Sequence, residues 1–322
     1  LSKKKISEGS LTLNLEKEIS KILEVKYVSM VSSGTTALLT AMIAIGLKRK
    51  DTILILERSW ISLLNAAAIL GLNIICIDVK KDKPVIDEKL FDNLKAKAKA
   101  IVVVHMGGRA TEIDEIIKKT KKKNIKIIED AAQAFGSKYN NKNLGTISEI
   151  GCFSLSMAKT ITSGQGGFLV TNNPVINKKI RKIKNNGLQN IMEVEKWGEI
   201  GLNFKYTDFN SCIASSDLRN HKRYIKSMID LYNFYKKNII KNKFLYILEV
   251  DIRNGEVPQY VEIICKKRKK FMKFMKQKKI QCREFYPSMS HSKFTKSVNK
   301  LNLNDSLFSR NGIFLPSGTH QK

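Results

Sequence analysis

Six short, almost uninterrupted aliphatic runs alternate with helical patterns over the first two thirds of the chain, and they constrain its fold most strongly. The runs cover residues 52–57, 73–79, 100–105, 125–130, 151–155 and 167–171, and the helical stretches between them lie near residues 36–47, 61–70, 87–97 and 112–123. Strands buried on both faces of a sheet have no regular polar alternation. The pattern therefore predicts an α/β fold, in which helices flank a mostly parallel central sheet and ligands bind at the carboxyl ends of its strands.

The pattern changes beyond about residue 210. A long helical stretch covers residues 210–238, and it is followed by a strand at 244–250 and an apolar run at 259–265. A basic amphipathic helix at 267–278 and a strand at 281–286 come next. This order predicts a smaller α+β domain after the large one. We expect a large domain over residues 1–214 and a small C-terminal domain over 215–322, joined through the long helix.

The bulk composition, 43% hydrophobic and 27% charged residues, is typical of a soluble globular protein. No run approaches the ~18 consecutive apolar residues of a membrane span, and the first residues lack the apolar core of a signal peptide. The five cysteines are scattered and show no CxxC spacing, which favours reduced thiols over disulfides or a zinc site. We therefore expect a cytoplasmic protein with neither a membrane partner nor a metal.

The net charge is +29, from 58 basic and 29 acidic residues. A field of this sign attracts polyanions and raises the alternative of nucleic-acid binding. The excess, however, is mostly lysine and is spread along the chain, with clusters at residues 118–123 and 266–270 on predicted helices. We interpret it as a compositional bias and a solvated surface, and we expect no nucleic-acid partner. The remaining alternative is that it helps to attract an anionic nucleotide substrate.

One lysine, Lys159, lies between two apolar runs, with a serine five residues before it and the turn Gly-Gln-Gly-Gly just after it. Burial of an ammonium group costs several kcal/mol unless the group is paired or chemically used. A desolvated lysine has a lowered pKa and can form a Schiff base with a carbonyl, as in the attachment of pyridoxal phosphate (PLP). Taken alone, Lys159 is better interpreted as a lysine that extends from a strand end to the solvent, and the other segments of the chain have to favour the chemical role.

Three further segments carry a possible chemical role beside a structural one. Residues 32–38 (SSGTTAL) open a helix, where free amides could bind a phosphate or where a Ser/Thr side chain simply caps the helix. Residues 127–133 (IIEDAAQ) place two carboxylates at a strand end, either to face a pyridine nitrogen or to cap the next helix. Trp60 could stack on a flat cofactor ring or belong to the core. Asn203 lies in a loop, where a turn is the alternative.

These segments follow one another in the order phosphate cradle, stacking aromatic residue, acid and lysine, and in this order they resemble a known family. The sequence is similar to the DegT/DnrJ/EryC1/StrS family of PLP-dependent sugar aminotransferases, which have the type I fold of aspartate aminotransferase. The resemblance runs from about residue 9 to residue 317. It rests on the segments SGTTAL (33–38), WISLLN (60–65), HMGG (105–108), EDAAQAFG (129–136), FS (153–154), Lys159, GQGG (164–167), GLN (201–203) and LPS (315–317).

The resemblance implies a role for each matching position. Lys159 would hold PLP covalently and serve as the catalytic acid and base, and Asp130 would pair with the pyridine nitrogen as the second catalytic group. The further cofactor-binding positions are Gln133 beside the ring, Trp60 stacked on it, Gly34, Thr35 and Ser154 at the phosphate, and Asn203 of a partner subunit completing that site. The last role implies a homodimer with shared active sites.

The resemblance implies an aminotransferase that moves an amino group, with glutamate as the donor, to a nucleotide-linked keto-sugar, a 4-keto-6-deoxy hexose. The product would serve surface-polysaccharide biosynthesis. One alternative within the family is a PLP-dependent keto-sugar dehydratase, in which histidine replaces the lysine. Others are a non-enzymatic, basic nucleic-acid-binding or regulatory protein on a PLP fold, and an impaired relative that still binds the cofactor.

The chain departs from the family pattern at several positions. Gln165 stands where the family often has Glu, Lys205 stands where it has Arg, and the helix segment CIASSDL at 212–218 differs from the usual one. The chain also stops at residue 322, where relatives continue through a further helix, so we expect a truncated small domain. These departures concern substrate contacts and dimer packing more than cofactor binding.

Overall fold

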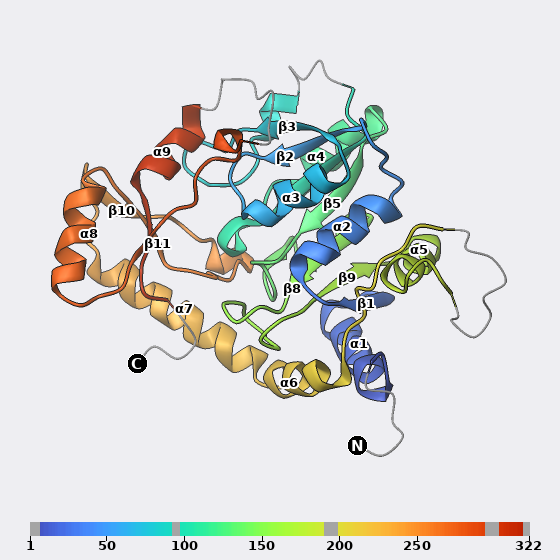
Figure 1. Cartoon of the computed structure of the whole chain (residues 1–322). Helices are drawn as coiled ribbons and strands as arrows, with labels where there is room; N and C mark the ends of the chain where they lie inside the picture. Colours follow the sequence, from blue (N-terminus) through green and yellow to red (C-terminus); the bar gives the residue numbers. More distant parts are fainter. Residues whose placement is uncertain (1–6, 92–96, 190–198, 294–302, 318–322) are drawn as a thin grey trace.

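A seven-stranded sheet forms the centre of the larger part of the molecule in the computed structural model of the chain, which describes residues 7–91, 97–189, 199–293 and 303–317 (Figure 1). Its strand order is β1-β9-β8-β5-β4-β2-β3. Strand β9 is antiparallel to both of its neighbours, and the other pairs are parallel. In chain order the strands are β1 (Tyr27–Val31), β2 (Thr52–Leu56), β3 (Asn73–Ile77), β4 (Ala100–Val104), β5 (Lys126–Asp130), β8 (Ile150–Ser154) and β9 (Gly167–Thr171).

Helices cover both faces of this sheet, as the aliphatic strands require. Side chains of α2 (Gly34–Ala44), α3 (Ile61–Ile69) and α5 (Pro174–Lys184) share one core cluster with Leu169 of β9. The neighbouring β9 residues Phe168 and Val170 point the other way and pack with α1 (Ser10–Leu23) and α6 (Asp208–Leu218). This alternation along one strand shows that both faces of the sheet are buried. Helix α4 (Ile113–Lys122) leads into β5, and β6 (Lys138–Tyr139) and β7 (Lys142–Asn143) form a small hairpin.

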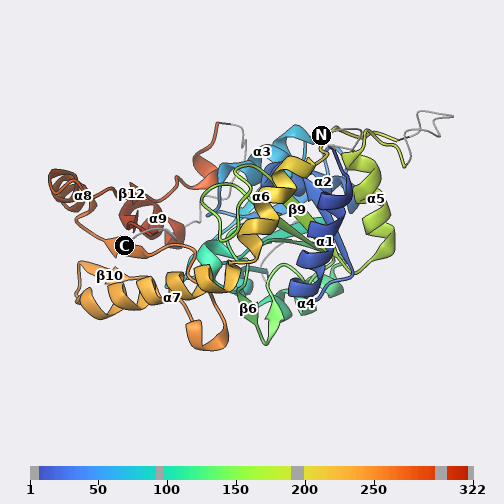
Figure 2. The same cartoon turned by 90° about the horizontal axis from the view of Figure 1, so that it is seen from below.

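The C-terminal part forms a smaller antiparallel sheet beside the large one (Figures 1 and 2). Its strand order is β10-β11-β13-β12, with β10 (Leu245–Ile247), β11 (Glu262–Cys265), β12 (Arg283–Glu284) and β13 (Gly312–Phe314). The helices here are α7 (His221–Asn238), α8 (Arg268–Gln277) and α9 (Leu303–Asn311). Tyr232 of α7 packs with β11 and β13, whereas Phe285, Phe308 and Phe314 join the core cluster of the large sheet. The two parts therefore share buried side chains.

The predicted α/β class with a mostly parallel sheet and an added α+β part is confirmed, and the six predicted strands are present within one or two residues. The helix predicted at 87–97 is wrong at its start, where the chain forms the short 3-10 helix η1 (Glu88–Phe91), and residues 92–96 lie outside the described ranges. Phe91 is the one buried residue of η1.

The single helix predicted at 210–238 is also wrong, because α6 ends at Leu218 and α7 begins at His221. Asn220 precedes α7, and its side-chain amide donates to the Ser216 carbonyl oxygen, while His221 Nδ1 contacts the Leu218 carbonyl oxygen at 2.6 Å. Asparagine competes with helical hydrogen bonds in this way and favours helix ends. The predicted domain boundary after residue 214 falls inside α6, and the division itself stays a prediction.

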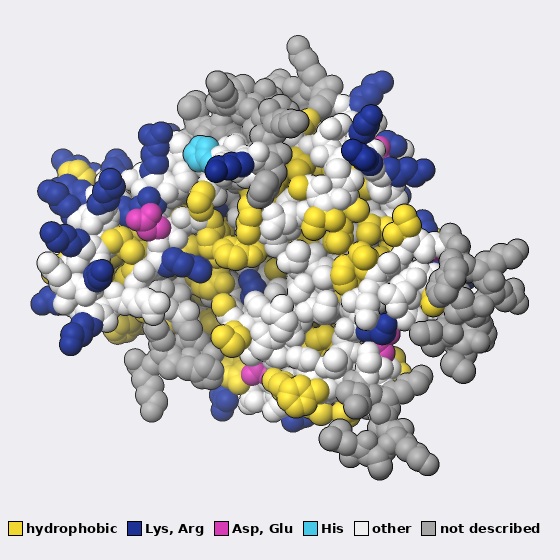
Figure 3. Space-filling model, viewed as in Figure 1, with side chains coloured by type: hydrophobic (Ala, Val, Ile, Leu, Met, Phe, Trp, Pro, Cys, Tyr) yellow, Lys and Arg dark blue, Asp and Glu magenta, His cyan; other side chains and the backbone are white. Residues whose placement is uncertain are grey.

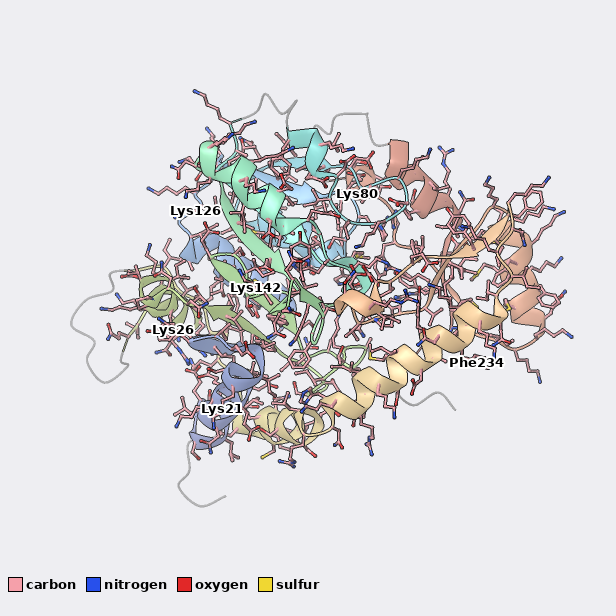
Figure 4. All side chains as sticks on the ribbon, turned by 180° about the vertical axis from the view of Figure 1, so that it is seen from behind. Lys21, Lys26, Lys80, Lys126, Lys142 and Phe234 are labelled. Carbon is pink, nitrogen blue, oxygen red and sulfur yellow. The ribbon has the colours of Figure 1, made fainter. Side chains whose placement is uncertain are left out.

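Positive charge is distributed over much of the described surface. Lysine and arginine side chains gather around α8 on the face drawn in Figure 3, and on the opposite side Lys21, Lys26, Lys80, Lys126 and Lys142 lie well apart from one another (Figure 4). The charge thus does not form one continuous stripe in these views. Among the helices of the described ranges, none combines the length and the apolar character needed to cross a membrane.

Candidate active site

The carboxyl ends of β4, β5 and β8, the first turn of α2 and residues from the small sheet enclose a cavity of about 340 Å³. This is the edge of the sheet at which ligands are expected in an open α/β fold. The cavity brings together Gly34, Thr35, Trp60, Asp130, Gln133, Ser154 and Lys159, all of which the sequence singled out. Asn203 is not among the lining residues: it is exposed and forms an isolated β-bridge with Asn185.

Lys159 lies in the loop that leaves β8, where its backbone N–H donates to the Ser156 carbonyl oxygen at 3.0 Å. Within the described part of the chain, its Nζ makes no hydrogen bond and no ion pair within 4.0 Å. Burial lowers the pKa of Lys159 to about 8; the Asp130 carboxylate acts in the opposite direction, and the positive charge of Arg283 adds to the lowering. A lysine of this kind carries a substantial neutral fraction near neutral pH, as a nucleophile or proton acceptor requires.

The two adjacent carboxylates at the end of β5 have very different surroundings. Glu129 is fully buried and accepts hydrogen bonds from His105 Nε2 at 3.0 Å and from the backbone N–H groups of Gly145 (2.7 Å), Ile147 (2.8 Å) and Ser148 (2.6 Å). Burial opposes its ionisation, but His105 and these amides outweigh it and lower the pKa of Glu129. Glu129 is therefore an ionised group that fixes the turn between β7 and β8.

Asp130 is the carboxylate that faces the cavity. It is 6% exposed, and its Oδ1 accepts one hydrogen bond, from the Ala132 N–H at 3.1 Å. Burial raises the pKa of Asp130, and this effect exceeds the opposing contributions of the Ala132 N–H and the nearby Lys159 and His105. A buried, sparsely hydrogen-bonded carboxylate of this kind gains from a positively charged partner placed against it.

The start of α2 supports both interpretations that the sequence left open, a capped helix and a phosphate-binding site. Ser33 caps the helix in a capping box with Thr36, through Thr36 N to Ser33 Oγ at 3.1 Å and Ser33 N to Thr36 Oγ1 at 3.0 Å. The next two amides, those of Gly34 and Thr35, have no partner within the described ranges, and both residues line the cavity. A Cβ added at Gly34 would lie 2.9 Å from Ser154 Cβ, so glycine allows the helix to approach the end of β8. The result is an anion cradle of two amides and a serine hydroxyl.

The segment HMGG at 105–108 positions Gln133. The Gly107 N–H donates to Gln133 Oε1 at 3.0 Å, and Gly107 has a φ of 62°. Gly108 also has a positive φ, 86°, and a Cβ there would lie 1.8 Å from the Val257 carbonyl oxygen. This turn therefore requires glycine both for its backbone conformation and for its contact with the C-terminal part of the chain.

Trp60 lies at the mouth of the cavity and is 50% exposed. Its ring meets that of Tyr286 edge to face, with centroids 4.9 Å apart. The exposure argues against a purely structural core position, which was the alternative from the sequence. Trp60 is therefore held by Tyr286 and still has exposed ring surface, which is compatible with stacking on a flat ligand.

Sequence reasoning did not identify the lining residues from the small domain, Tyr260, Arg283 and Tyr286. Arg283 and Tyr286 belong to the predicted strand at 281–286, of which only Arg283–Glu284 is a strand in the structure. The signal that could have found them is one arginine and one tyrosine three residues apart in a short segment rich in lysine. Nothing local to that segment, however, indicates that it faces the ends of β5 and β8.

Comparison with known proteins agrees with this geometry. The model of the DegT/DnrJ/EryC1/StrS aminotransferase family matches residues 1–320. Over 235 residues the chain is 31% identical to GDP-perosamine synthase of Escherichia coli O157:H7, which covers 72% of this chain and 64% of that protein. It is 29% identical over 252 residues to UDP-4-amino-4,6-dideoxy-N-acetyl-beta-L-altrosamine transaminase of Campylobacter jejuni, with 76% and 66% covered. The chain thus matches just under two thirds of the length of these relatives.

Solved structures show the same fold at lower identity. Helicobacter pylori PseC, described as an aminotransferase involved in the biosynthesis of pseudoaminic acid, superposes with a TM-score of 0.91 at 22% identity, covering 100% of this chain and 89% of that one. E. coli GDP-4-keto-6-deoxy-D-mannose-3-dehydratase gives a TM-score of 0.90 at 23% identity, covering 98% and 89%. The family model spans nearly the entire chain, and the fold agrees with it. The chain therefore belongs to the DegT/DnrJ/EryC1/StrS aminotransferase family.

Proposed function

We propose that the protein is a PLP-dependent aminotransferase that moves an amino group from glutamate to a nucleotide-linked keto-sugar, a 4-keto-6-deoxy hexose. The observation that carries the proposal is Lys159 Nζ, which has no partner in the described chain and lies in a cavity with a buried carboxylate and an open helix start. The relatives support the substrate class, since they are named as a GDP-perosamine synthase and a transaminase of a UDP-linked amino sugar.

The residues of the cavity fit PLP. The two amides at the start of α2, which have no partner among the described residues, and the hydroxyl of Ser154 suit its phosphate, and the missing Cβ of Gly34 lets the helix start lie against Ser154. Asp130 suits its ring nitrogen, and Lys159 suits its aldehyde. Trp60 and Gln133 would border the ring. When bound, PLP supplies an electron sink that the protein side chains lack.

The protein side chains supply proton transfer, charge and orientation. With a pKa of about 8, the Lys159 amine can both accept and release a proton near neutral pH, which suits a general acid and base. Asp130, in its ionised form, would stabilise a protonated nitrogen placed against it in the cavity. Gln133 is fixed by Gly107, so its amide presents a constant orientation to a bound ring.

The proposal extends to a homodimer in which Asn203 contributes to the cavity of the partner subunit. Asn203 is exposed and outside its own cavity. Large apolar side chains are also exposed nearby in the chain and in the Lys159 loop, with Phe209 71% and Met157 82% exposed. A second copy would cover such residues. Sedimentation should give a dimer, and Asn203→Ala should weaken PLP binding without changing the monomer fold.

We place the reaction in the cytoplasm, supported by five free thiols.

The direct test supplies the PLP-loaded protein with glutamate and GDP- or UDP-linked 4-keto-6-deoxy sugars, and measures 2-oxoglutarate and the sugar product by mass spectrometry. The expected result is one 2-oxoglutarate formed for each ketone converted to an amine. An Asp130→Asn variant should retain PLP but lose most of the rate. A deoxy product without amine would indicate the dehydratase chemistry that a lysine at position 159 argues against. The absence of 2-oxoglutarate with every sugar would overturn the proposal.

A further inference from the structure

Arg283 is a charged residue of the cavity for which neither the family motifs nor the sequence assigned a role. It lies on β12, at the edge of the small sheet, and lines the cavity opposite the large-domain residues. Its guanidinium carbon lies 5.1 Å from the centroid of the Tyr286 ring and 4.8 Å from that of Phe314. Nη2 also donates to Tyr286 Oη at 2.9 Å. Two rings and one hydrogen bond therefore fix the plane of the guanidinium.

No carboxylate of the described chain lies within ion-pair distance of Arg283. The acids nearest to it in the small sheet are engaged elsewhere: Glu284 pairs with Arg268 at 3.0 Å, and Glu262 pairs with the buried Arg109. A guanidinium carries five N–H donors, and here the structure gives one of its nitrogens a partner. Its remaining donors are available to an anion in the cavity, and a carboxylate matches them with two parallel hydrogen bonds.

The position of Arg283 relative to Lys159 distinguishes between the anions of the reaction. The two side chains line the same cavity of about 340 Å³, and they are close enough for the charge of Arg283 to act on Lys159. In an amino acid, the α-carboxylate is bonded to the carbon that carries the reacting amine. In a nucleotide-linked 4-keto sugar, the diphosphate is attached across the ring from the ketone. A cation beside the reacting lysine is therefore better placed for the α-carboxylate than for the diphosphate.

We propose that Arg283, held against Tyr286 and Phe314, binds the α-carboxylate of the amino-acid donor and so selects an amino acid for the first half of the reaction. This inference rests on the proposed function. It predicts that Arg283 determines the affinity for the donor and has little effect on the affinity for the nucleotide sugar.

The experiment titrates PLP-loaded wild type, Arg283→Gln and Arg283→Lys with glutamate, and follows the visible spectrum to obtain the half-saturating concentration. Arg283→Gln should raise that concentration roughly 10- to 100-fold, because a charge-assisted pair is lost. Arg283→Lys should give a half-saturating concentration between those of the wild type and Arg283→Gln, since lysine keeps the positive charge but lacks the paired N–H donors of a guanidinium. The matched control is Arg253→Gln, an exposed arginine of the 3-10 helix Ile252–Asn254 outside this cavity, and it should behave as wild type.

A donor analogue locates the interaction on the ligand. Isoglutamine has an amide in place of the α-carboxylate, so the wild type should already bind it weakly. Arg283→Gln should then raise the half-saturating concentration of isoglutamine less than about 3-fold. Glutarate, which lacks the reacting amine, provides a binding measurement by calorimetry that does not depend on turnover.

The outcomes separate the inference from the proposed function. Should wild type react with glutamate and Arg283→Gln show the same half-saturation, the inference is wrong and the aminotransferase proposal stands. The inference is also wrong if Arg283→Gln raises KM for the nucleotide sugar but not for glutamate. It is equally wrong if Arg283→Gln weakens the binding of isoglutamine as much as that of glutamate. A wild type that fails to react with any amino acid contradicts the proposed function itself. Unchanged PLP absorbance and unfolding temperature in Arg283→Gln show that a loss of donor affinity is not a loss of fold.

Discussion

The lowered pKa of Lys159 leads to a measurable prediction about the PLP-free protein. Burial lowers this pKa from an ordinary value of 10.5 to about 8. At pH 7.5 an amine of pKa 8 is about one quarter neutral, whereas one of pKa 10.5 is neutral in about one molecule in a thousand. Only the neutral amine attacks an electrophile, so Lys159 should react about 200-fold faster than an ordinary lysine of equal accessibility and nucleophilicity.

The assay labels the PLP-free protein with a small amine-reactive reagent over pH 6 to 11 and quantifies the Lys159 peptide by mass spectrometry. The other lysine peptides of the same digest are the internal reference. The Lys159 profile should reach half its maximum near pH 8. A profile that continues to rise to the pH range of the reference lysines would refute the reasoning, because it would mean that the cavity does not desolvate this amine.

Two variants test the causes of the shift separately. Arg283→Gln removes a positive neighbour that lowers the pKa of Lys159, so the profile should move to higher pH. Asp130→Asn removes a negative neighbour that raises it, so the profile should move to lower pH. Shifts in the same direction for both variants would contradict the electrostatic account, since the two charges have opposite signs.

Further predictions concern the cradle, the buried carboxylate and the thiols. Gly34→Ala should weaken PLP binding at least ~10-fold, measured by titration, because its Cβ would lie 2.9 Å from Ser154 Cβ; unchanged affinity would exclude the close approach. Glu129→Gln should lower the free energy of unfolding by about 1–3 kcal/mol in urea. Since folding lowers the pKa of Glu129, its stabilisation is present above its unfolded pKa and is lost as the pH falls through the folded value; equal acid sensitivity in the variant would contradict this. In native protein a thiol reagent should label exposed Cys212 quickly and leave Cys152, which is buried and has a raised pKa, until unfolding.

Much of the fold could be predicted because its strands are local aliphatic runs. The edge strand β1 and the helices α1 and α5 were not predicted, and they complete the sheet and its covering layers. The break between α6 and α7 was also missed: helical periodicity continues through it, and the side chains of Asn220 and His221 end it.

The candidate site was predictable where its residues follow strand ends, as Asp130, Ser154 and Lys159 do. The local pattern did not distinguish Glu129 from Asp130, and the choice of Asp130 came from the family resemblance; the physical reason for it depends on amides at 145–148 that lie near Glu129 only in the folded chain. Arg283 was missed for a similar reason, since the small sheet brings it to the cavity from more than a hundred residues away.

The central claim is that Lys159 attaches PLP in this cavity, and the visible absorption spectrum tests it most directly. Wild type incubated with PLP and freed of excess should show the absorption band of lysine-linked PLP, and glutamate should shift it to that of the amine form. Lys159→Ala should lack the band, whereas Lys142→Ala, an exposed lysine of the β6–β7 hairpin, should keep it. A band that persists unchanged in Lys159→Ala, or one absent from wild type at saturating PLP, would contradict the account.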